Sequence, residues 1–298
     1  MISLSLSLSA QIKDVAFFPK TYKHSDIKGI SILDVKEVFF EEENEIAFSG
    51  VSALAYSQEK VLYALSDRGY LYHLDVEIDN RKIEKLLLKK RIPLKNKKSK
   101  ILKNNDAEGM AWSEKGLIIS FERDPKISLF DVNARKINNL KIPKVLRRIK
   151  NYQKKNRALE SVVFHPRFGL VTAPESALKH EDETSHVLYA LDRRWKFKAQ
   201  GKITSLEVMP DNKVLILQRE FDILKGHTIT LSTIDLEGCT EQWCQTETLA
   251  SMKSEDGWNL DNFEGLTWIR DDLYLMISDD NENFLQKCIM ILFEVKGK

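Results

Sequence analysis

Acidic residues recur at one point of a repeating pattern in this sequence. A small or acidic residue followed by a short apolar run appears five times, and glutamate opens three of these runs. The opening residues are Ser49, Glu108, Glu160, Thr204 and Glu264. Carboxylates that meet in space can hold a hard cation such as Ca²⁺ or act as general acids and bases. The question is which architecture would bring them together.

A second recurring set follows the next apolar run of each repeat and places acids beside arginines. Its members are Asp67-Arg68, Glu122-Arg123, Arg219-Glu220 and Asp279-Asp280-Asn281. Arginine binds phosphate or carboxylate groups through two parallel hydrogen bonds, and a neighbouring acid can transfer a proton. We therefore interpret five residues of this set as candidate catalytic groups: Asp67, Arg68, Glu122, Arg123 and Arg219.

Carboxylates that converge repel one another, so burying them costs free energy unless a cation compensates. Arginines of the second set are one source of positive charge, and Ca²⁺ is another. The candidate metal ligands are Glu108, Glu160, Glu264, Asp279 and Asp280. The candidate groups for binding an anionic substrate are Arg68, Arg123, Arg219 and Asn281.

Each of these patterns also has a structural interpretation. The repeated glutamates could tie neighbouring repeats together through hydrogen bonds to backbone N–H groups, and Arg219-Glu220 could form an ion pair between repeats. The run 279–281 is a good turn sequence in itself. These alternatives remain open at the level of sequence.

The elements that must position these residues are short β-strands. Between the five recurring phrases, which lie roughly 45–60 residues apart, apolar and alternating segments rich in Val, Ile, Leu and aromatic residues are separated by turn residues. This spacing is typical of a β-propeller, whose repeats all begin at one central channel. We therefore predict an all-β fold, a single β-propeller domain over residues 1–298, with both sets of side chains at one end of the channel.

Five repeats predict five blades, and the last repeat is one strand short. The segment 30–40 has strand character but no repeat of its own, so we expect it to supply the missing strand and close the ring. A sixth, degenerate blade built from residues 11–40 is the alternative. A helix is expected only near residues 145–155.

Composition gives few constraints on partners. The chain has 298 residues and a net charge of +2, and its basic residues concentrate in segments 81–104 and 141–157. Such runs are most often solvated, although they could contact anionic lipid; they contain few aromatic side chains for stacking on bases, so we expect no nucleic-acid partner. No apolar run is long enough for a transmembrane helix, and we expect a monomer.

The N-terminus and the cysteines bear on localisation. The opening sequence MISLSLSLSAQ resembles the end of an export signal, so segment 1–26 is interpreted as its remnant and the protein as periplasmic or secreted. Cys239 and Cys244 could form a small disulfide in an oxidising compartment, whereas Cys288 lies in an apolar strand.

Motifs of several common enzyme classes are absent. The sequence contains no G-x-S-x-G nucleophile elbow, no P-loop and no H-E-x-x-H zinc motif. His165 precedes a proline and reads as a turn residue rather than a catalytic base.

Taken together, the recurring motifs resemble the secreted bacterial family called esterase-like activity of phytase. The resemblance covers about residues 47–295 and rests on motifs in the expected order: Leu65-Ser-Asp-Arg-Gly69, Asp106-Ala-Glu-Gly-Met-Ala-Trp112, Ser120-Phe-Glu-Arg123, Asn156-Arg-Ala-Leu-Glu-Ser161, Leu215-Ile-Leu-Gln-Arg-Glu-Phe-Asp222, Asp261-Asn-Phe-Glu-Gly-Leu266 and Ile277-Ser-Asp-Asp-Asn281. Two departures are Glu160-Ser161 in place of Glu-Gly, and the basic insertion at 81–104.

The resemblance implies a β-propeller that is exported and hydrolyses ester or phosphate-ester bonds. From it and the residues above, we expect a metal-assisted hydrolase of a small anionic or ester substrate, with Ca²⁺ as the metal. The alternative is a non-catalytic propeller that binds an anionic ligand or an envelope protein through the same surface.

Overall fold

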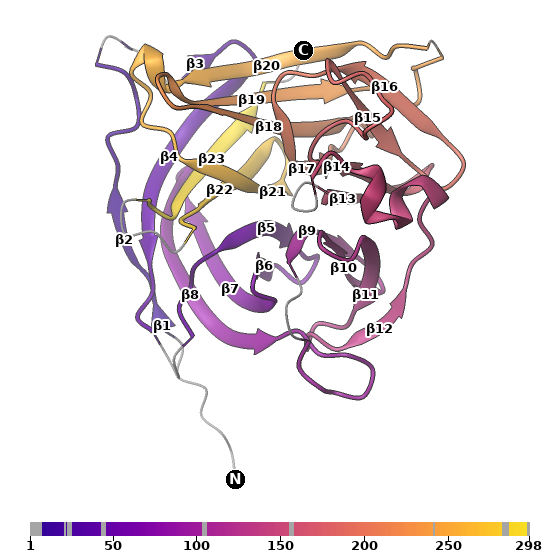
Figure 1. The fold of residues 1–298 in the computed structure, drawn as a ribbon. Helices are drawn as coiled ribbons and strands as arrows, with labels where there is room; N and C mark the ends of the chain where they lie inside the picture. The colour runs from indigo at the N-terminus through magenta and orange to yellow at the C-terminus, as the bar shows by residue number, and fades with distance from the viewer. Residues whose placement is uncertain are drawn as a thin grey trace.

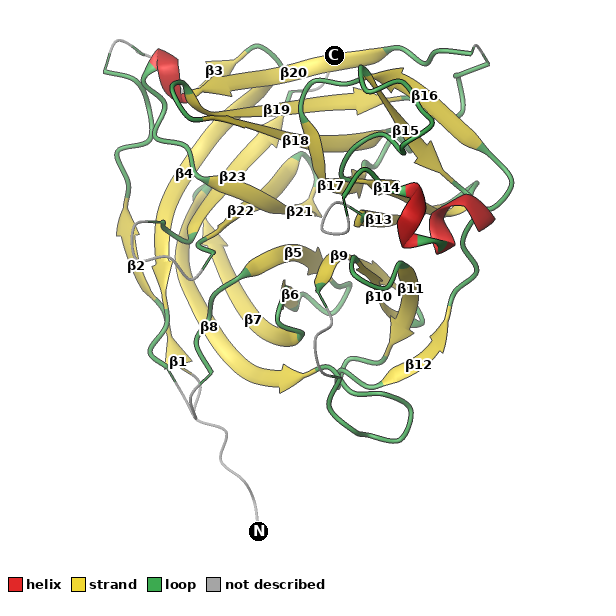
Figure 2. Ribbon diagram, viewed as in Figure 1, coloured by secondary structure: helices red, strands yellow, loops and turns green. Residues whose placement is uncertain are grey.

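The chain folds into five antiparallel β-sheets arranged as blades around a central channel (Figures 1 and 2). The computed structural model describes residues 8–20, 22, 26–42, 46–102, 106–154, 158–240, 242–281 and 286–296. Each blade runs from an inner strand beside the channel to outer strands, and the strands of each repeat follow one another in chain order. The predicted five-bladed β-propeller is confirmed.

The first three blades contain one repeat each. Blade 1 is built from β5 (Val51–Tyr56), β6 (Leu62–Ser66), β7 (Tyr70–Asp79) and β8 (Lys82–Pro93), with β1 (Leu8–Ser9) added outside β8. Blade 2 is built from β9 (Ala107–Ser113), β10 (Gly116–Phe121), β11 (Lys126–Phe130) and β12 (Lys136–Asn139). Blade 3 is built from β13 (Leu159–His165), β14 (Gly169–Pro174), β15 (Ser185–Tyr189) and β16 (Arg194–Lys198).

The last two blades complete the ring. Blade 4 is built from β17 (Lys202–Val208), β18 (Val214–Asp222), β19 (Gly226–Ile234) and β20 (Thr246–Lys253). Blade 5 is built from β21 (Asn262–Arg270), β22 (Leu273–Asp279) and β23 (Ile289–Val295), followed in space by β4 (Ile30–Phe39) and β2 (Gln11–Asp14), with β3 (Asp26–Ile27) paired to β4.

Helical structure among the described residues is confined to short 3₁₀ turns. They are η1 (Lys144–Arg147), η2 (Ile149–Asn151) and η3 (Ser254–Asp256). The helix expected near 145–155 is therefore two separate 3₁₀ turns, broken at Arg148, whose backbone is extended.

The N-terminal strand closes the ring, as predicted. β4 pairs antiparallel with β23 over seven residue pairs, from Ile289↔Glu37 to Val295↔Ile30. Residues of the 11–40 segment thus extend the fifth blade, and they do not form a sixth blade. The closure covers an edge of β23 that would otherwise be open to pairing with another chain.

Strands β6, β10 and β22 are mostly apolar because both of their faces are buried between neighbouring blades. In β22, Tyr274 and Met276 pack into the cluster shared with blade 4, whereas Leu275 and Ile277 pack into the cluster shared with blade 1. Similar clusters fill the other three blade interfaces. The core is thus a ring of five interfaces, and each blade is stabilised by its two neighbours.

Two local features bear on the sequence expectations. Cys239 and Cys244 form a disulfide, and Cys288 is a buried free thiol. His165 has a structural role, because its Nε2 bonds the Asn212 carbonyl at 2.8 Å and its Nδ1 accepts from Arg167 N. No helix in the described part of the chain has the length and apolar character needed to cross a bilayer.

Candidate active site in the acidic mouth of the channel

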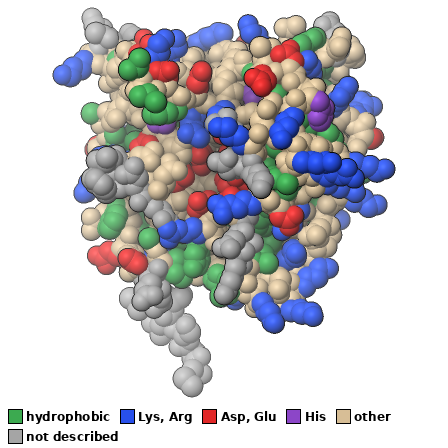
Figure 3. Space-filling model, in the orientation of Figure 1, with side chains coloured by type: hydrophobic (Ala, Val, Ile, Leu, Met, Phe, Trp, Pro, Cys, Tyr) green, Lys and Arg blue, Asp and Glu red, His purple; other side chains and the backbone are tan. Residues whose placement is uncertain are grey.

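One end of the channel, which we call the acidic mouth, is formed where the inner strands begin and the second strands end. The register places Val51 opposite Ser66, Ala107 opposite Phe121, and Asn262 opposite Asp279. Figure 3 shows acidic side chains gathered in the hollow at the middle of this face, with basic ones around it. Both recurring sets of residues therefore meet at one end of the axis, as the sequence predicted.

A β-bulge in each blade explains the recurring phrase. The inner pair of strands shifts register at Glu160 and at Glu264, where one extra residue of the inner strand faces the second strand. In blade 2 the shift spans Glu108 and Gly109. A bulge turns a side chain out of the regular alternation, and here it directs the glutamates to the mouth.

The small residue after the glutamate permits close packing of inner strands. A Cβ on Gly109 would lie 2.7 Å from the Glu160 carbonyl oxygen, and one on Gly265 would lie 3.2 Å from Leu54 N and 2.6 Å from a methyl group of Ile277. The Glu-Gly motif thus couples a channel-facing carboxylate to a tight contact between adjacent blades.

In blades 1 and 4 the bulge residue is a hydroxyl residue that ties two blades together. Ser52 donates to the Ala107 carbonyl at 2.7 Å, and Thr204 donates to the Phe263 carbonyl at 3.1 Å. Ser52, three residues after Ser49, is therefore the counterpart of the glutamates in blade 1. Glu207, three residues after Thr204, lies near the other end of β17.

Glu108 and Glu160 do not act as such ties. Within the described residues, neither side chain makes a hydrogen bond or ion pair, whereas Glu264 accepts from Asn262 Nδ2 at 2.8 Å and from Arg219 of blade 4 at 3.4 Å. The ties to the next blade come instead from the second set: Glu122 accepts from Ala158 N, and Asp280 accepts from Gly50 N.

Three carboxylates of blade 2 form the tightest acidic group. One oxygen each from Asp106, Glu108 and Glu122 lies within 4.8 Å of the others. Asp106 precedes β9, Glu108 lies on its bulge, and Glu122 follows β10, so one blade end supplies all three. Oxygen ligands at this spacing are what a hard cation such as Ca²⁺ requires.

Burial and mutual repulsion raise the pKa values of these carboxyl groups. Loss of water contact, and then the charge of Glu264, holds the pKa of Glu108 well above its ordinary value, and burial with the charge of Glu108 does the same for Glu160. Burial is also the main cause that raises the pKa of Glu122 and of Glu264 to about 8, and that of Asp279 to about 7. These carboxylates interact as one cluster across the channel and favour a bound cation.

The arginines lie at the edge of this cluster. Arg123 donates through Nε to Asp106 at 2.6 Å, with 65% of its side chain exposed. Arg68 is exposed, and its positive charge acts on Asp67 and Asp280. Burial raises the pKa of Asp67. All the candidate site residues thus lie around one mouth.

A polar cavity of about 390 Å³ adjoins the cluster between blades 4 and 5. It is lined by Lys202, Arg219, Phe221, His227, Asn262, Asn281 and Gln286. Within the described residues, Arg219 Nε, His227 Nδ1 and Asn262 Oδ1 are buried without a hydrogen-bond partner. A ligand with both acceptor and donor groups would satisfy them.

Sequence reasoning did not assign roles to several of these residues. Lys202, which bonds Glu175 at 2.8 Å, Gln286 and His227 have no repeated signature, and Asp106 is only part of a family motif in the sequence. For Asp106 the signal was its position two residues before the repeated glutamate. For Lys202, its register opposite Arg219 was the missing information.

A family model described as "Phytase-like: Esterase-like activity of phytase" matches residues 46–282. The chain belongs to this family. The match spans the five inner strands and both sets of mouth residues, so the suspected resemblance is confirmed. Membership in the Phytase-like family supports a hydrolase-like propeller.

Solved structures share the fold with this Phytase-like protein. They include the β-propeller domain of Cps50 (Swd1) from Myceliophteria thermophila (TM-score 0.46, 8% identity, covering 96% of this chain and 100% of that one). A second example is the Dos1 propeller (TM-score 0.37, 13% identity, covering 91% of this chain and 75% of that one). A third is PQQ-bound aldose sugar dehydrogenase from Streptomyces coelicolor (TM-score 0.43, 8% identity, covering 96% of this chain and 98% of that one). At this level of similarity they carry no argument about function. The search of curated proteins finds no match.

Proposed function

We propose that this protein hydrolyses a phosphoester or ester at the acidic mouth with the help of a bound Ca²⁺. The observation that carries the proposal is the group of Asp106, Glu108 and Glu122, whose oxygens lie within 4.8 Å of one another, together with the raised pKa values of Glu108 and Glu122. Such a cluster lowers the stability of the folded protein, since each ionised carboxylate disfavours the ionisation of the others, so a functional role would explain its presence.

Asp106, Glu108 and Glu122 would hold the metal, with the carboxylates of Glu160, Glu264, Asp279 and Asp280 around them. Carboxylate oxygens are the donors that Ca²⁺ prefers, and two of the three are accessible enough to exchange a ligand. When bound, Ca²⁺ would polarise an oxygen of the scissile group and neutralise the cluster.

The remaining residues would bind the substrate and accept a proton from the attacking water. Arg123 and Arg68 lie at the rim, and Arg219 faces the adjoining cavity with Asn281, so the three guanidinium groups can bind an anionic group and stabilise charge that develops in the transition state. Asp67, whose pKa is raised, would take a proton from attacking water.

We also propose that the protein is exported and that it is a monomer. The Cys239–Cys244 disulfide supports an oxidising compartment such as the periplasm or the cell exterior, because such bonds persist there.

The test measures hydrolysis of phosphomonoesters, phosphodiesters and carboxylic esters by metal-stripped protein, with and without Ca²⁺. Glu108→Gln is compared with Glu114→Gln, a change at an exposed turn of the same blade, and Arg123→Ala with Arg135→Ala, another exposed arginine that pairs with an aspartate. We expect Ca²⁺-dependent turnover that is lost in the first variant of each pair only. Calcium binding without turnover on any substrate would refute the hydrolase and favour the anion-binding propeller.

A further inference from the structure

The end of the channel opposite the acidic mouth carries a second cavity, which we call the aromatic mouth. It has a volume of about 550 Å³ and is lined by the ends of the inner strands and the turns that follow them. In four of the five blades the same position at the end of the inner strand is aromatic: Tyr56, Trp112, Phe164 and Trp268, with Val208 in the fifth. Tyr56 and Trp112 of this ring also pack against the hydrophobic core.

The aromatic side chains remain accessible. Phe164 is 51% exposed and Trp268 is 37% exposed, whereas residues one position earlier, such as Ala55 and Val163, are buried. Large exposed aromatic surface gathered in a concave site is typical of ligand binding. Phe164 and Trp268 therefore offer exposed aromatic surface at this mouth, whereas the Trp112 ring stacks on Tyr63.

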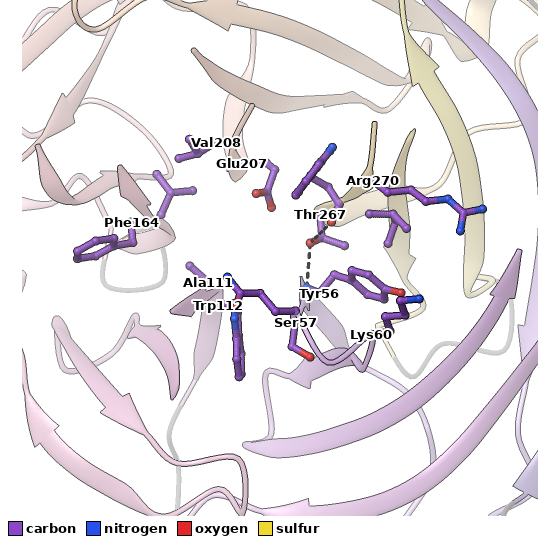
Figure 4. A pocket seen from close by; sticks show the side chains of 14 residues that line it. Tyr56, Ser57, Lys60, Ala111, Trp112, Phe164, Glu207, Val208, Thr267 and Arg270 are labelled. Carbon is purple, nitrogen blue, oxygen red and sulfur yellow. Dashed lines mark hydrogen bonds between the residues drawn. The ribbon is translucent and has the colours of Figure 1, made fainter. Parts of the chain in front are cut away.

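Glu207 is the one acidic residue among the lining residues of this cavity. Figure 4 shows its carboxylate directed toward the middle of the mouth, between side chains of Thr267 and Val208. The neighbouring Thr267 hydroxyl accepts a hydrogen bond from Tyr56 N at 3.1 Å. Among the described residues, no basic side chain forms an ion pair with Glu207.

The two basic lining residues are directed away from Glu207. Figure 4 shows the Arg270 guanidinium and the Lys60 ammonium both pointing outward, and Arg270 donates to the Ile78 carbonyl at 3.4 Å. The cavity thus presents one carboxylate that faces its middle and has Tyr56 and Trp268 among its lining side chains, which is a combination that favours a cation with an apolar body.

We propose that the aromatic mouth binds an organic ammonium compound, with its positive group at Glu207 and its apolar part against Trp268 and Tyr56. This site is independent of the hydrolase proposed for the acidic mouth, because it shares no residue with it.

Titration provides an internal check on the charge pairing. Burial raises the pKa of Glu207 to about 8. Burial also raises the pKa of the Tyr56 and Tyr274 phenols, which therefore stay neutral near pH 8. No histidine lines the cavity. Between pH 6.5 and 8.5 Glu207 is therefore the group that changes charge, and an alkylammonium keeps its proton over this range, as lysine does.

The experiment follows binding of 2-phenylethylammonium by tryptophan fluorescence and calorimetry, with 2-phenylethanol as its neutral counterpart and 3-phenylpropionate as its anionic one. We expect saturable binding of the ammonium, binding of the other two that is weaker by at least about tenfold, and affinity that increases about tenfold from pH 6.5 to 8.5. Absence of binding up to millimolar concentration, or equal binding of the alcohol, would overturn the proposal.

Variants locate the site. Glu207→Gln keeps the size of the side chain and should weaken ammonium binding at least tenfold and abolish its pH dependence. Trp268→Leu should also weaken it, whereas Trp243→Leu, a matched change beside Lys196 on the disulfide loop, should not. If Glu207→Gln does not fold, Trp268→Leu and the pH dependence of the wild type decide the matter; unchanged affinity in Trp268→Leu would place the ligand elsewhere.

Discussion

The carboxyl groups of the acidic mouth predict that the metal-free protein loses stability as the pH rises above neutrality. Their folded-state pKa values lie above the ordinary values of an unfolded chain. At any pH between the unfolded-state and the folded-state pKa, the folded protein therefore binds more protons than the unfolded chain. Stability is therefore highest below the unfolded pKa and falls as the pH rises through the folded pKa. Calcium that binds the ionised cluster should reverse this loss.

The magnitude follows from the three groups with pKa values of about 7 to 8. From pH 6.5 to 8.5, linkage gives a loss of about 2 kcal/mol for each of Glu122 and Glu264 and about 1 kcal/mol for Asp279. The entropy of unfolding of a chain of 298 residues is roughly 0.6 kcal/mol per degree, and dividing the loss of stability by it gives the change in Tm. Ionisation of Glu122 or Glu264 alone then lowers the Tm by about 3 °C, and ionisation of all three groups lowers it by about 8 °C. Glu207 contributes about 2 kcal/mol more, which calcium at the acidic mouth should not restore.

Differential scanning fluorimetry in EDTA at pH 6.5, 7.5 and 8.5, with and without excess Ca²⁺, measures this effect. His73 does not titrate in this window, since burial holds its pKa at about 4. Glu108→Gln should abolish most of the rescue by calcium, whereas Glu114→Gln should not. A Tm that stays constant or rises with pH in EDTA would refute the reasoning, because the cluster could not then be an electrostatic cost to the fold.

Three further predictions concern single residues. Leu217→Ala, at a fully buried position between blades 4 and 5, should lower the free energy of unfolding by about 2–5 kcal/mol in urea titrations, and a smaller loss would argue against tight packing there. Replacing Cys239 and Cys244 together by Ser should cost about 2 kcal/mol, because the disulfide closes only a short loop; equal Tm values for oxidised wild type and variant would contradict this. Arg123→Ala should change stability by less than about 1 kcal/mol, since its partner interaction is exposed, yet lower kcat/KM for an anionic substrate by about 100-fold. Comparable losses of stability and activity would instead assign Arg123 a structural role.

Most of the fold could be predicted from the sequence because each level of pattern agreed with the others. Five recurring phrases gave five blades, and the missing strand of the last repeat matched the unassigned strand at 30–39. The helix near 145–155 was less secure, since propensity alone does not distinguish an α-helix from the two 3₁₀ turns at η1 and η2.

The candidate site could be located but not resolved from the sequence. Propeller geometry was sufficient to bring Glu108, Glu122 and Asp279 to one mouth. It could not show that Asp106 joins Glu108 and Glu122, because that depends on a bulge of one residue, nor that Glu207 lies at the opposite mouth, because strand ends depend on register. The ring of aromatic residues was visible only after the strands were aligned in space.

The seam between β4 and β23 also determines when the acidic mouth comes into existence. A ribosome makes β4 long before β23, so the ring can close only after the fifth blade has been synthesised, and this closure brings Asp280 to the Gly50 amide and Asp279 near Asp67. The repulsion that Asp279 adds at this mouth therefore arises only when the ring closes, and it is lost again when the ring opens. A cation that neutralised the carboxylates of the mouth would stabilise the closed ring and slow its opening, and it would leave the rate of blade formation nearly unchanged.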